Sequence, residues 1–311
     1  MTSPSKTIRV VERDIELLSV VGRFRFMSAQ HLGALLFPSE KAAGERCRAL
    51  LGAKLLVEVF VPVRPYSRSS RTVYALSARG ARLVADERAE RHHHLSESER
   101  RSGLFLDHTL ARNTLYVVLE LLHRAGTLQL LSWRHAPDEV GMSAKIIEDG
   151  LARRIPLVPD AVVVVRADGR DELLVVEIDM GTVAPVRMAR KYAAYWKAWR
   201  LGTLARLAPA PVRVLTLTTT PSRLARLRLA SRAAAEGDRT TRLFWFALLD
   251  GLDLAHPDQV LTAICSTSDT NDKHLLPIFT SSTSVCPPGH GVPAPLGSND
   301  DPSSAAVVAT A

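Results

Sequence analysis

Between residues 161 and 248, apolar segments of strand length alternate with helical segments, and this alternation constrains the possible folds more than any other feature of the chain. The segments, in order, are strands at 161–166 and 172–179, a helix at 186–200, a strand at 212–219, a basic helix at 222–235 and a last strand or short helix at 243–248. A helix at 104–125 and a strand at 128–134 precede them, which gives the order α-β-β-β-α-β. That order predicts a protein of the α/β (α+β) class with a mixed sheet flanked by helices.

Two details complete the prediction around this sheet. The helix at 104–125 is apolar on nearly all sides, so we expect it to be buried. One narrow polar stripe interrupts it, because Asn113, Glu120 and Arg124 project in similar directions at about 100° per residue. The stretch 138–156 is predicted to be a loop.

The N-terminal 80 residues have a different pattern, in which three short helices precede two strand-like runs. Ser28 and Ser39 are typical N-cap residues and mark the starts of the second and third helices. The strand-like runs cover 55–63 and 72–76, and the basic, turn-rich segment 64–71 joins them. Three short helices followed by a basic β-hairpin is the plan of a winged helix–turn–helix domain.

In such a domain the third helix enters the major groove of DNA, and the arginines of the wing reach the backbone or the minor groove. The third helix has one apolar face, and its opposite face is polar. The polar face and the wing supply the residues that we expect to contact DNA, namely Lys41, Glu45, Arg48, Arg64, Arg68 and Arg71. The alternative is a small protein-binding winged helix, such as a dimerisation module.

The charge distribution favours a polyanionic partner. The chain has 40 Lys and Arg against 32 Asp and Glu, a formal net charge of +8, and residues 1–80 alone have 13 basic and 6 acidic residues, a surplus of 13 − 6 = +7. We therefore expect double-stranded DNA to be the partner, bound through this N-terminal quarter of the chain, which we take to hold most of the basic excess. The alternative explanation of the many arginines is a genome rich in G and C, because such a genome encodes arginine often. Only 7 of the 40 basic residues are lysine, as this explanation expects.

Other classes of protein fit the sequence poorly. No apolar run approaches the roughly 18–20 residues of a membrane span, and the start of the chain lacks the apolar region of a secretory signal. Cys47, Cys265 and Cys286 are too scattered for a disulfide framework or for metal-ligand spacing. We expect a cytoplasmic protein that does not bind membranes.

Two polar segments separate or follow the expected domains. Residues 81–103 are highly charged and are predicted to link the winged helix at 1–80 to a sheet domain at 104–265. The three adjacent histidines at 92–94 cannot all face one metal ion from a helix, so we interpret them as solvated surface residues. In residues 266–311, 22 of 46 residues are Ser, Thr, Pro or Gly, which predicts a disordered tail.

Three acidic residues at strand ends form the candidate chemical site. Asp160 stands at the mouth of one strand, and Glu177 and Asp179, two residues apart on the neighbouring strand, share a face. Converging carboxylates repel one another unless a cation neutralises them, and hard oxygen ligands select Mg²⁺ or Mn²⁺. Such an ion can polarise a phosphodiester and activate a water molecule. Lys191, in the next helix, is placed to stabilise the charge that develops on the phosphate.

The order of elements and acidic residues resembles that of the PD-(D/E)xK restriction-endonuclease-like nucleases. Asp160 matches the first carboxylate of their motif and Glu177 matches the second. These nucleases usually have lysine where this chain has Asp179, and Lys191 matches a lysine that has migrated to the following helix. The resemblance implies a restriction-endonuclease-like domain in which these four residues are catalytic and the three acids bind the metal.

A longer part of the chain, from about residue 10 to residue 220, resembles the replication-relaxation family of plasmid and mobile-element proteins. The matching motifs, in order, are the winged helix, His108-x-x-x-x-Asn113, Trp133, Pro159-Asp160-Ala161, Glu177-Ile-Asp179-x-Gly181-Thr182 and Lys191-x-x-x-Tyr195. The resemblance implies a protein that binds plasmid DNA at an origin-like site and relaxes it, by metal-dependent nicking, during replication or mobilisation. Other mobilisation proteins are further partners that it implies.

Four more residues are candidates for the site, and each has a structural alternative. His108 and Asn113 either take part in the chemistry or pack and cap a helix, and Glu120 either completes the acidic site or forms an ion pair within its own helix. Tyr195 is either a covalent nucleophile or a core residue. Because the usual lysine is missing, the alternative for the whole chain is a non-enzymatic winged-helix replication or transcription regulator with a degenerate nuclease-like core.

Overall fold

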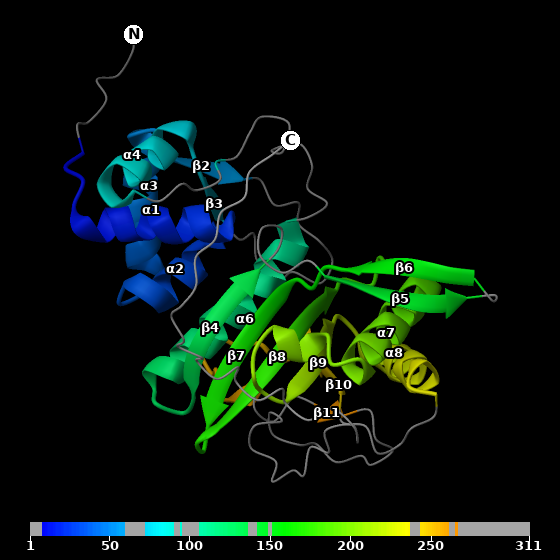
Figure 1. The fold of residues 1–311 in the computed structure, drawn as a ribbon. Helices are drawn as coiled ribbons and strands as arrows, with labels where there is room; N and C mark the ends of the chain where they lie inside the picture. Colours follow the sequence, from blue (N-terminus) through cyan, green and yellow to red (C-terminus); the bar gives the residue numbers. More distant parts are fainter. Residues whose placement is uncertain are drawn as a thin grey trace, which may run out of the picture.

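A computed structural model of the chain places a small, mainly helical unit beside a six-stranded sheet that has helices on both faces (Figure 1). The residues that the structure describes are 8–59, 72–89, 94, 106–135, 142–148, 151–236, 243–260 and 265–266. The α/β class with a mixed sheet, expected from the order of the apolar segments, is confirmed.

The first part of the described chain, which we call the N-terminal unit, contains helices and a three-stranded antiparallel sheet. Its elements are α1 (Glu12–Phe24), β1 (Met27–Ser28), α2 (Ala29–Leu36), α3 (Glu40–Gly52), β2 (Leu56–Val59), β3 (Val73–Leu76) and α4 (Ala78–Arg88), and the strand order is β1-β3-β2. The two predicted N-caps are confirmed. The Ser28 hydroxyl accepts a hydrogen bond from the backbone N–H of His31 at 3.1 Å, and the Ser39 hydroxyl accepts one from that of Ala42 at 3.2 Å.

The large sheet has the strand order β11-β10-β9-β8-β7-β4. Its strands are β4 (Gln129–His135), β7 (Ala161–Ala167), β8 (Arg170–Asp179), β9 (Val212–Thr218), β10 (Phe244–Leu248) and β11 (Cys265–Ser266). The pairs β4·β7, β7·β8 and β10·β11 are antiparallel, whereas β8·β9 and β9·β10 are parallel. Asp168 and Gly169 form the tight turn between β7 and β8, and both have positive φ, a conformation typical of an Asp-Gly hairpin turn.

Helices cover the two faces of the sheet and pack on separate apolar clusters. Helix α6 (Leu106–Arg124) lies on one face, where Val118 belongs to the same cluster as Val163 and Val176. Helices α7 (Pro185–Arg200) and α8 (Pro221–Ala234) lie on the other face, with Val175 and Tyr192 in their cluster (Figure 1). Because side chains alternate along a strand, odd-numbered residues of β8 point toward α7 and α8.

The prediction that residues 138–156 form a loop is wrong. Strands β5 (Met142–Glu148) and β6 (Leu151–Leu157) form an antiparallel hairpin, and Glu148 pairs with Leu151. The sequence between these strands is Asp149-Gly150, the dipeptide most typical of two-residue hairpin turns. The hairpin packs against α7, so its stability depends on contacts that are distant in the sequence.

The segment predicted as a linker and the one predicted as a tail are described only in part. Helix α4 includes residues 81–88 of the expected linker, and Val84 is buried against the core of the N-terminal unit. Most of residues 89–105 and all of 267–311 lie outside the described residues.

Helix α6 joins the N-terminal unit to the sheet, and one continuous apolar cluster contains residues of all three. The Asn113 side chain, which is fully buried, donates to the backbone carbonyls of Phe24 at 3.1 Å and Phe26 at 2.6 Å. These carbonyls flank Arg25, which has a φ of 67° in the turn that ends α1. Asn113 therefore holds a strained turn of the N-terminal unit against α6.

His135, at the end of β4, completes this joint and makes the stability of the protein depend on pH. Its Nδ1 accepts from the Trp133 indole N–H at 3.3 Å, so its Nε2 carries the proton and donates to the Arg23 carbonyl at 3.0 Å. Burial, together with the charge of Arg112, lowers the pKa of His135 to about 4.

We expect the protein to lose stability as the pH falls from about 6.5 to 4. In this range His135 is protonated in the unfolded protein but stays neutral in the folded protein. The loss should be on the order of 2 kcal/mol after allowance for partial solvent exposure. Urea unfolding across this pH range measures it, with His135→Gln as the control because glutamine keeps a donor and does not titrate. A parent and a variant with the same pH dependence would contradict the assignment.

Candidate functional site

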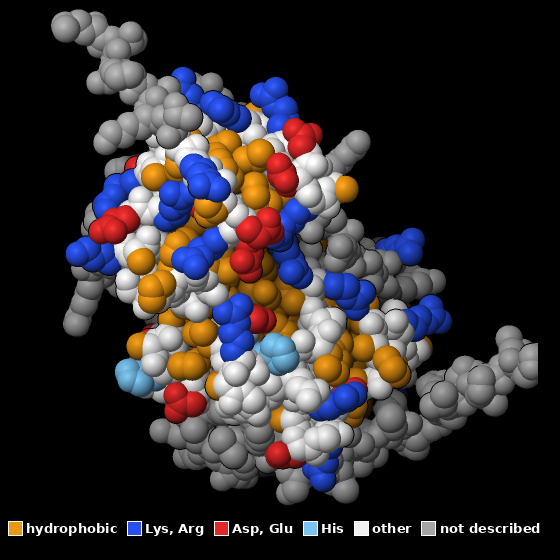
Figure 2. All heavy atoms as spheres, turned by 90° about the vertical axis from the view of Figure 1, so that its left-hand side faces the viewer, with side chains coloured by type: hydrophobic (Ala, Val, Ile, Leu, Met, Phe, Trp, Pro, Cys, Tyr) orange, Lys and Arg blue, Asp and Glu red, His pale blue; other side chains and the backbone are white. Residues whose placement is uncertain are grey.

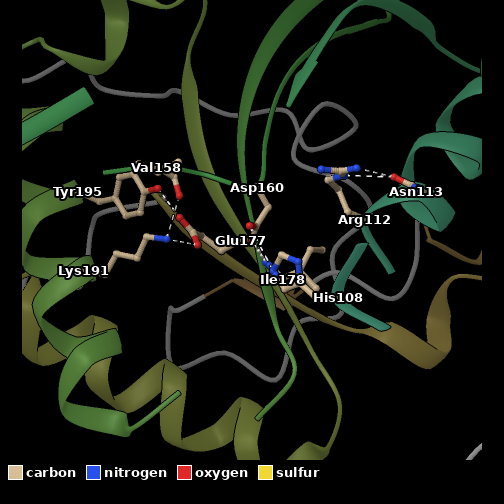
Figure 3. A network of polar contacts seen from close by, with 9 residues as sticks. All are labelled: His108, Arg112, Asn113, Val158, Asp160, Glu177, Ile178, Lys191 and Tyr195. Atoms are coloured by element: carbon tan, nitrogen blue, oxygen red, sulfur yellow. Dashed lines mark hydrogen bonds and ion pairs between the residues drawn. The ribbon is translucent and has the colours of Figure 1, made fainter. Parts of the chain in front are cut away.

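Asp160 is fixed at the start of β7 by contacts with the neighbouring strand and with α6 (Figure 3). Its backbone N–H donates to the Val176 carbonyl at 2.9 Å, and one carboxylate oxygen accepts from the backbone N–H of Ile178 at 2.7 Å. The other carboxylate oxygen lies 3.2 Å from His108 Nε2. The carboxylate is thus oriented by the strand, and α6 reaches it through His108.

Glu177 lies on β8 next to Asp160, and its side chain points to α7 (Figure 3). One carboxylate oxygen accepts from the Tyr195 hydroxyl, and the other forms an ion pair with the Lys191 ammonium. Lys191 also donates to the Val158 carbonyl at 3.2 Å. Glu177 is only 4% exposed, and burial raises its pKa to about 7, with the charge of Lys191 opposing the rise and that of Asp160 adding to it.

Asp179 does not join the other two acids, so the expected convergence of three carboxylates does not occur. It shares a face of β8 with Glu177, as predicted, but Arg223 of α8 binds both of its oxygens, at 2.8 and 3.0 Å. The Thr218 hydroxyl donates to it at 2.8 Å, and Asp179 is 2% exposed. Within the described residues, no group of three or more His, Cys, Asp or Glu side chains is arranged to hold a metal ion.

Asp160 and Glu177 are the acids that remain as candidate ligands for a divalent cation, and each of their carboxylate oxygens has a partner within the protein. Mg²⁺ is usually held by one or two carboxylates, and water or substrate phosphate completes its coordination. The two side chains supply hard oxygen donors, and the negative charge of Asp160 contributes to the raised pKa of Glu177. The ammonium of Lys191 offsets part of this charge.

The other sequence candidates occupy different places. His108 contacts Asp160 directly, whereas Asn113 lies at the joint with the N-terminal unit. Glu120 forms the ion pair within its own helix, with Arg124 at 2.8 Å. Tyr195 is buried and donates to Glu177, and burial raises its pKa far above the ordinary value, so the geometry favours a core residue over a nucleophile.

The residues predicted to read DNA on the third helix are at the surface. Ala43, Cys47 and Leu50 form the buried face of α3, and Lys41, Glu45 and Arg48 are exposed, as the helical spacing predicts. Figure 2 shows Lys and Arg side chains over the N-terminal unit, mixed with acidic and apolar ones. The expected wing residues Arg64, Arg68 and Arg71 lie outside the described residues.

Sequence reasoning missed two arginines that shape the site. Arg223 neutralises Asp179. A buried acid needs a basic partner, and this requirement is the signal from which such an arginine could have been expected. Arg112 follows His108 by one turn of α6; burial lowers its pKa to about 10, and the charge of Asp160 opposes that shift. In Figure 3 Arg112 lies between His108 and Asn113, and dashed lines join it to Asn113.

None of the described helices is both long enough and apolar enough to cross a bilayer.

The chain was compared with protein families, curated proteins and solved structures. No curated protein and no solved structure matches the chain. The family model described as replication-relaxation matches residues 18–208, which is more than half of the chain and includes α3, Asp160, Glu177 and Lys191. This description supports a role in replication or mobilisation, and the chain belongs to the replication-relaxation family.

Proposed function

We propose that the chain is a DNA-binding protein that nicks plasmid or mobile-element DNA during replication or mobilisation. The observation that carries the proposal is the buried Glu177, ion-paired with Lys191 and adjacent to Asp160 near the ends of two central strands of a mixed sheet. An acid this well buried and next to a second acid lowers stability when ionised, which is typical of a functional site. Membership in the family supports the same role.

In this proposal Asp160 and Glu177 would hold Mg²⁺ or Mn²⁺, and the ion would polarise the phosphodiester and activate water. The backbone N–H of Ile178 and the His108 ring fix the direction of the Asp160 carboxylate. The charge of Lys191 favours the ionised form of Glu177, and the same ammonium would stabilise the phosphate as negative charge develops. Asp179 is given a structural role, because Arg223 and Thr218 occupy its oxygens.

The test of this activity is the incubation of purified protein with supercoiled plasmid and Mg²⁺ or Mn²⁺. We expect open circles to form, and EDTA should prevent their formation. If the plasmid stays supercoiled with either ion while the protein binds the same DNA, the nicking proposal fails.

The N-terminal unit would dock on the DNA as a winged helix–turn–helix, with Lys41, Glu45 and Arg48 of α3 in the major groove. We expect Lys41→Gln/Arg48→Gln to weaken binding to duplex DNA about tenfold or more, because each lost contact of this kind costs roughly 1–3 kcal/mol. Electrophoretic mobility shifts measure the affinity. Lys54→Gln/Arg79→Gln removes the same charge from other exposed positions of this unit and serves as the control; equal losses in both variants would contradict a specific role for α3.

A second candidate function is a non-enzymatic replication or transcription regulator with a degenerate nuclease-like core. The pairing of Asp179 with Arg223 favours it, because this position, where the nucleases that the sequence resembles usually have lysine, is occupied by a structural ion pair. A protein that binds DNA with sequence preference and leaves plasmid intact with both metal ions would have this function.

A further inference from the structure

Residues 180–235 contain eleven Lys and Arg and neither Asp nor Glu. Their surplus of +11 exceeds the +7 of residues 1–80, so the expectation that the N-terminal quarter carries most of the basic excess is wrong. Three of the eleven, Lys191, Arg213 and Arg223, form ion pairs with acids of β8. The other eight are exposed or partly exposed, on α7, on α8 or on the turn between α7 and β9.

The two helices lie side by side on one face of the large sheet (Figure 1). Arg200, at the end of α7, lies 3.7 Å from Glu236, just after the end of α8, so the helices run in the same direction. The short helix at Leu204–Arg206 packs against α7. We call six cations of this surface the basic layer: the partly exposed Lys197 and the exposed Arg187, Arg190, Arg200, Arg206 and Arg226.

The basic layer brings like charges close together. Like charges three or four residues apart on a helix repel one another, and Arg187 and Arg190, and Lys197 and Arg200, are spaced in this way. Surface helices usually intersperse acidic residues that relieve such repulsion, and these helices contain none. Cations that extend over two neighbouring helices without acidic residues between them suit a polyanionic ligand.

We propose that the basic layer binds the phosphate backbone of duplex DNA, independently of sequence, as a second DNA contact besides α3. Helix α7 is about 24 Å long, and duplex DNA carries one phosphate charge per ~1.7 Å of its axis, so the layer can contact several phosphates. The layer begins at Arg187, one helical turn before Lys191, so DNA held on it lies next to the Asp160–Glu177 pair. The inference rests on the proposed DNA role and deepens it.

The experiment measures binding of the full chain to a fluorescent random-sequence duplex by anisotropy over a range of salt concentrations. The test variant is R187Q/K197Q/R206Q/R226Q, in which all four replaced residues are exposed or partly exposed. Each lost phosphate contact lowers the slope of log affinity against log salt by about 0.9, so the parent should lose on the order of 100-fold more affinity than the variant between about 50 and 200 mM salt.

The matched control is K54Q/R79Q/R82Q/R170Q, which also removes one lysine and three arginines from exposed positions outside the layer. A control that loses as much slope as the test variant, or a test variant that binds like the parent, overturns the inference. If the fourfold variant does not fold, R187Q and R226Q singly should each lower the slope by about 0.9. K41Q/R48Q distinguishes the DNA contact through α3 from the contact through the basic layer. This variant changes DNA binding only if the proposed contact through α3 is correct.

Vesicles of phosphatidylcholine and phosphatidylserine offer a different anionic surface in the same assay. The layer is expected to bind DNA much more strongly than such vesicles. A test variant that loses vesicle binding but keeps the salt dependence of DNA binding would assign the layer to a membrane and overturn the inference.

Discussion

Glu177→Gln should abolish the nicking of supercoiled plasmid, and Lys191→Ala should slow it about 100-fold or more, the loss typical of one electrostatic donor. Glutamine keeps the shape of the side chain but loses the negative charge that binds a cation. Alanine at 191 removes the ammonium, which is not a metal ligand, so the affinity for Mg²⁺ or Mn²⁺ should persist. Both variants should bind DNA like the parent, because neither residue belongs to α3 or to the basic layer.

Glu172→Gln is the matched control, since Glu172 is a buried acid on the same strand that pairs with Arg213. It should nick like the parent. Burial raises the pKa of Glu177 to about 7 in the folded protein. The folded protein is therefore more stable when Glu177 is neutral, and this stability is lost as the pH rises through 7. Glu177→Gln should therefore be at least as stable as the parent at pH 8, which separates lost chemistry from lost folding. If Glu177→Gln and Lys191→Ala relax plasmid at the parent rate, the site is not a nuclease.

Arg223→Met should lower the free energy of unfolding by about 3–5 kcal/mol, because it leaves Asp179 as a buried charge without its ion-pair partner. Urea denaturation measures the change. Arg226→Met, at an exposed position of the same helix, should change the stability by no more than about 0.5 kcal/mol.

The double variant Asp179→Leu/Arg223→Met should recover most of this loss, because an apolar pair of similar volume can replace a buried ion pair. If Arg223→Met costs no more than Arg226→Met, then Asp179 does not depend on Arg223. It would then be available as a third metal ligand, as the sequence alone predicted.

Elements with a local signal were predicted well from the sequence. Ser28 and Ser39 cap helices through hydrogen bonds to N–H groups three residues away, so a short stretch of sequence contains both partners. The turn at Asp168-Gly169 also fixes the register of β7 and β8, which places Asp160 beside Glu177. The hairpin β5–β6 was missed although Asp149-Gly150 signals it, because its strands pack on α7 and lack a regular apolar alternation.

The part of the site that was not predictable depends on distant partners. Arg223 follows Asp179 by 44 residues, and only the packing of α8 on the sheet brings the two together. His108 reaches Asp160 from α6 across the end of a strand, and Asn113 contacts the carbonyls of Phe24 and Phe26, almost ninety residues earlier. Spacing along the chain places residues on a face but does not identify what packs against that face.

The apolar cluster that α6 shares with the N-terminal unit and the sheet has a consequence for how this protein can evolve. Recombination that exchanged the first 80 residues between relatives would separate Phe24 from Asn113 and cut through one continuous core. Such a chimera would carry mismatched side chains at the cut, and mismatched cores cost several kcal/mol. Relatives should therefore acquire new DNA targets by substitutions on the exposed face of α3, with the two halves inherited together.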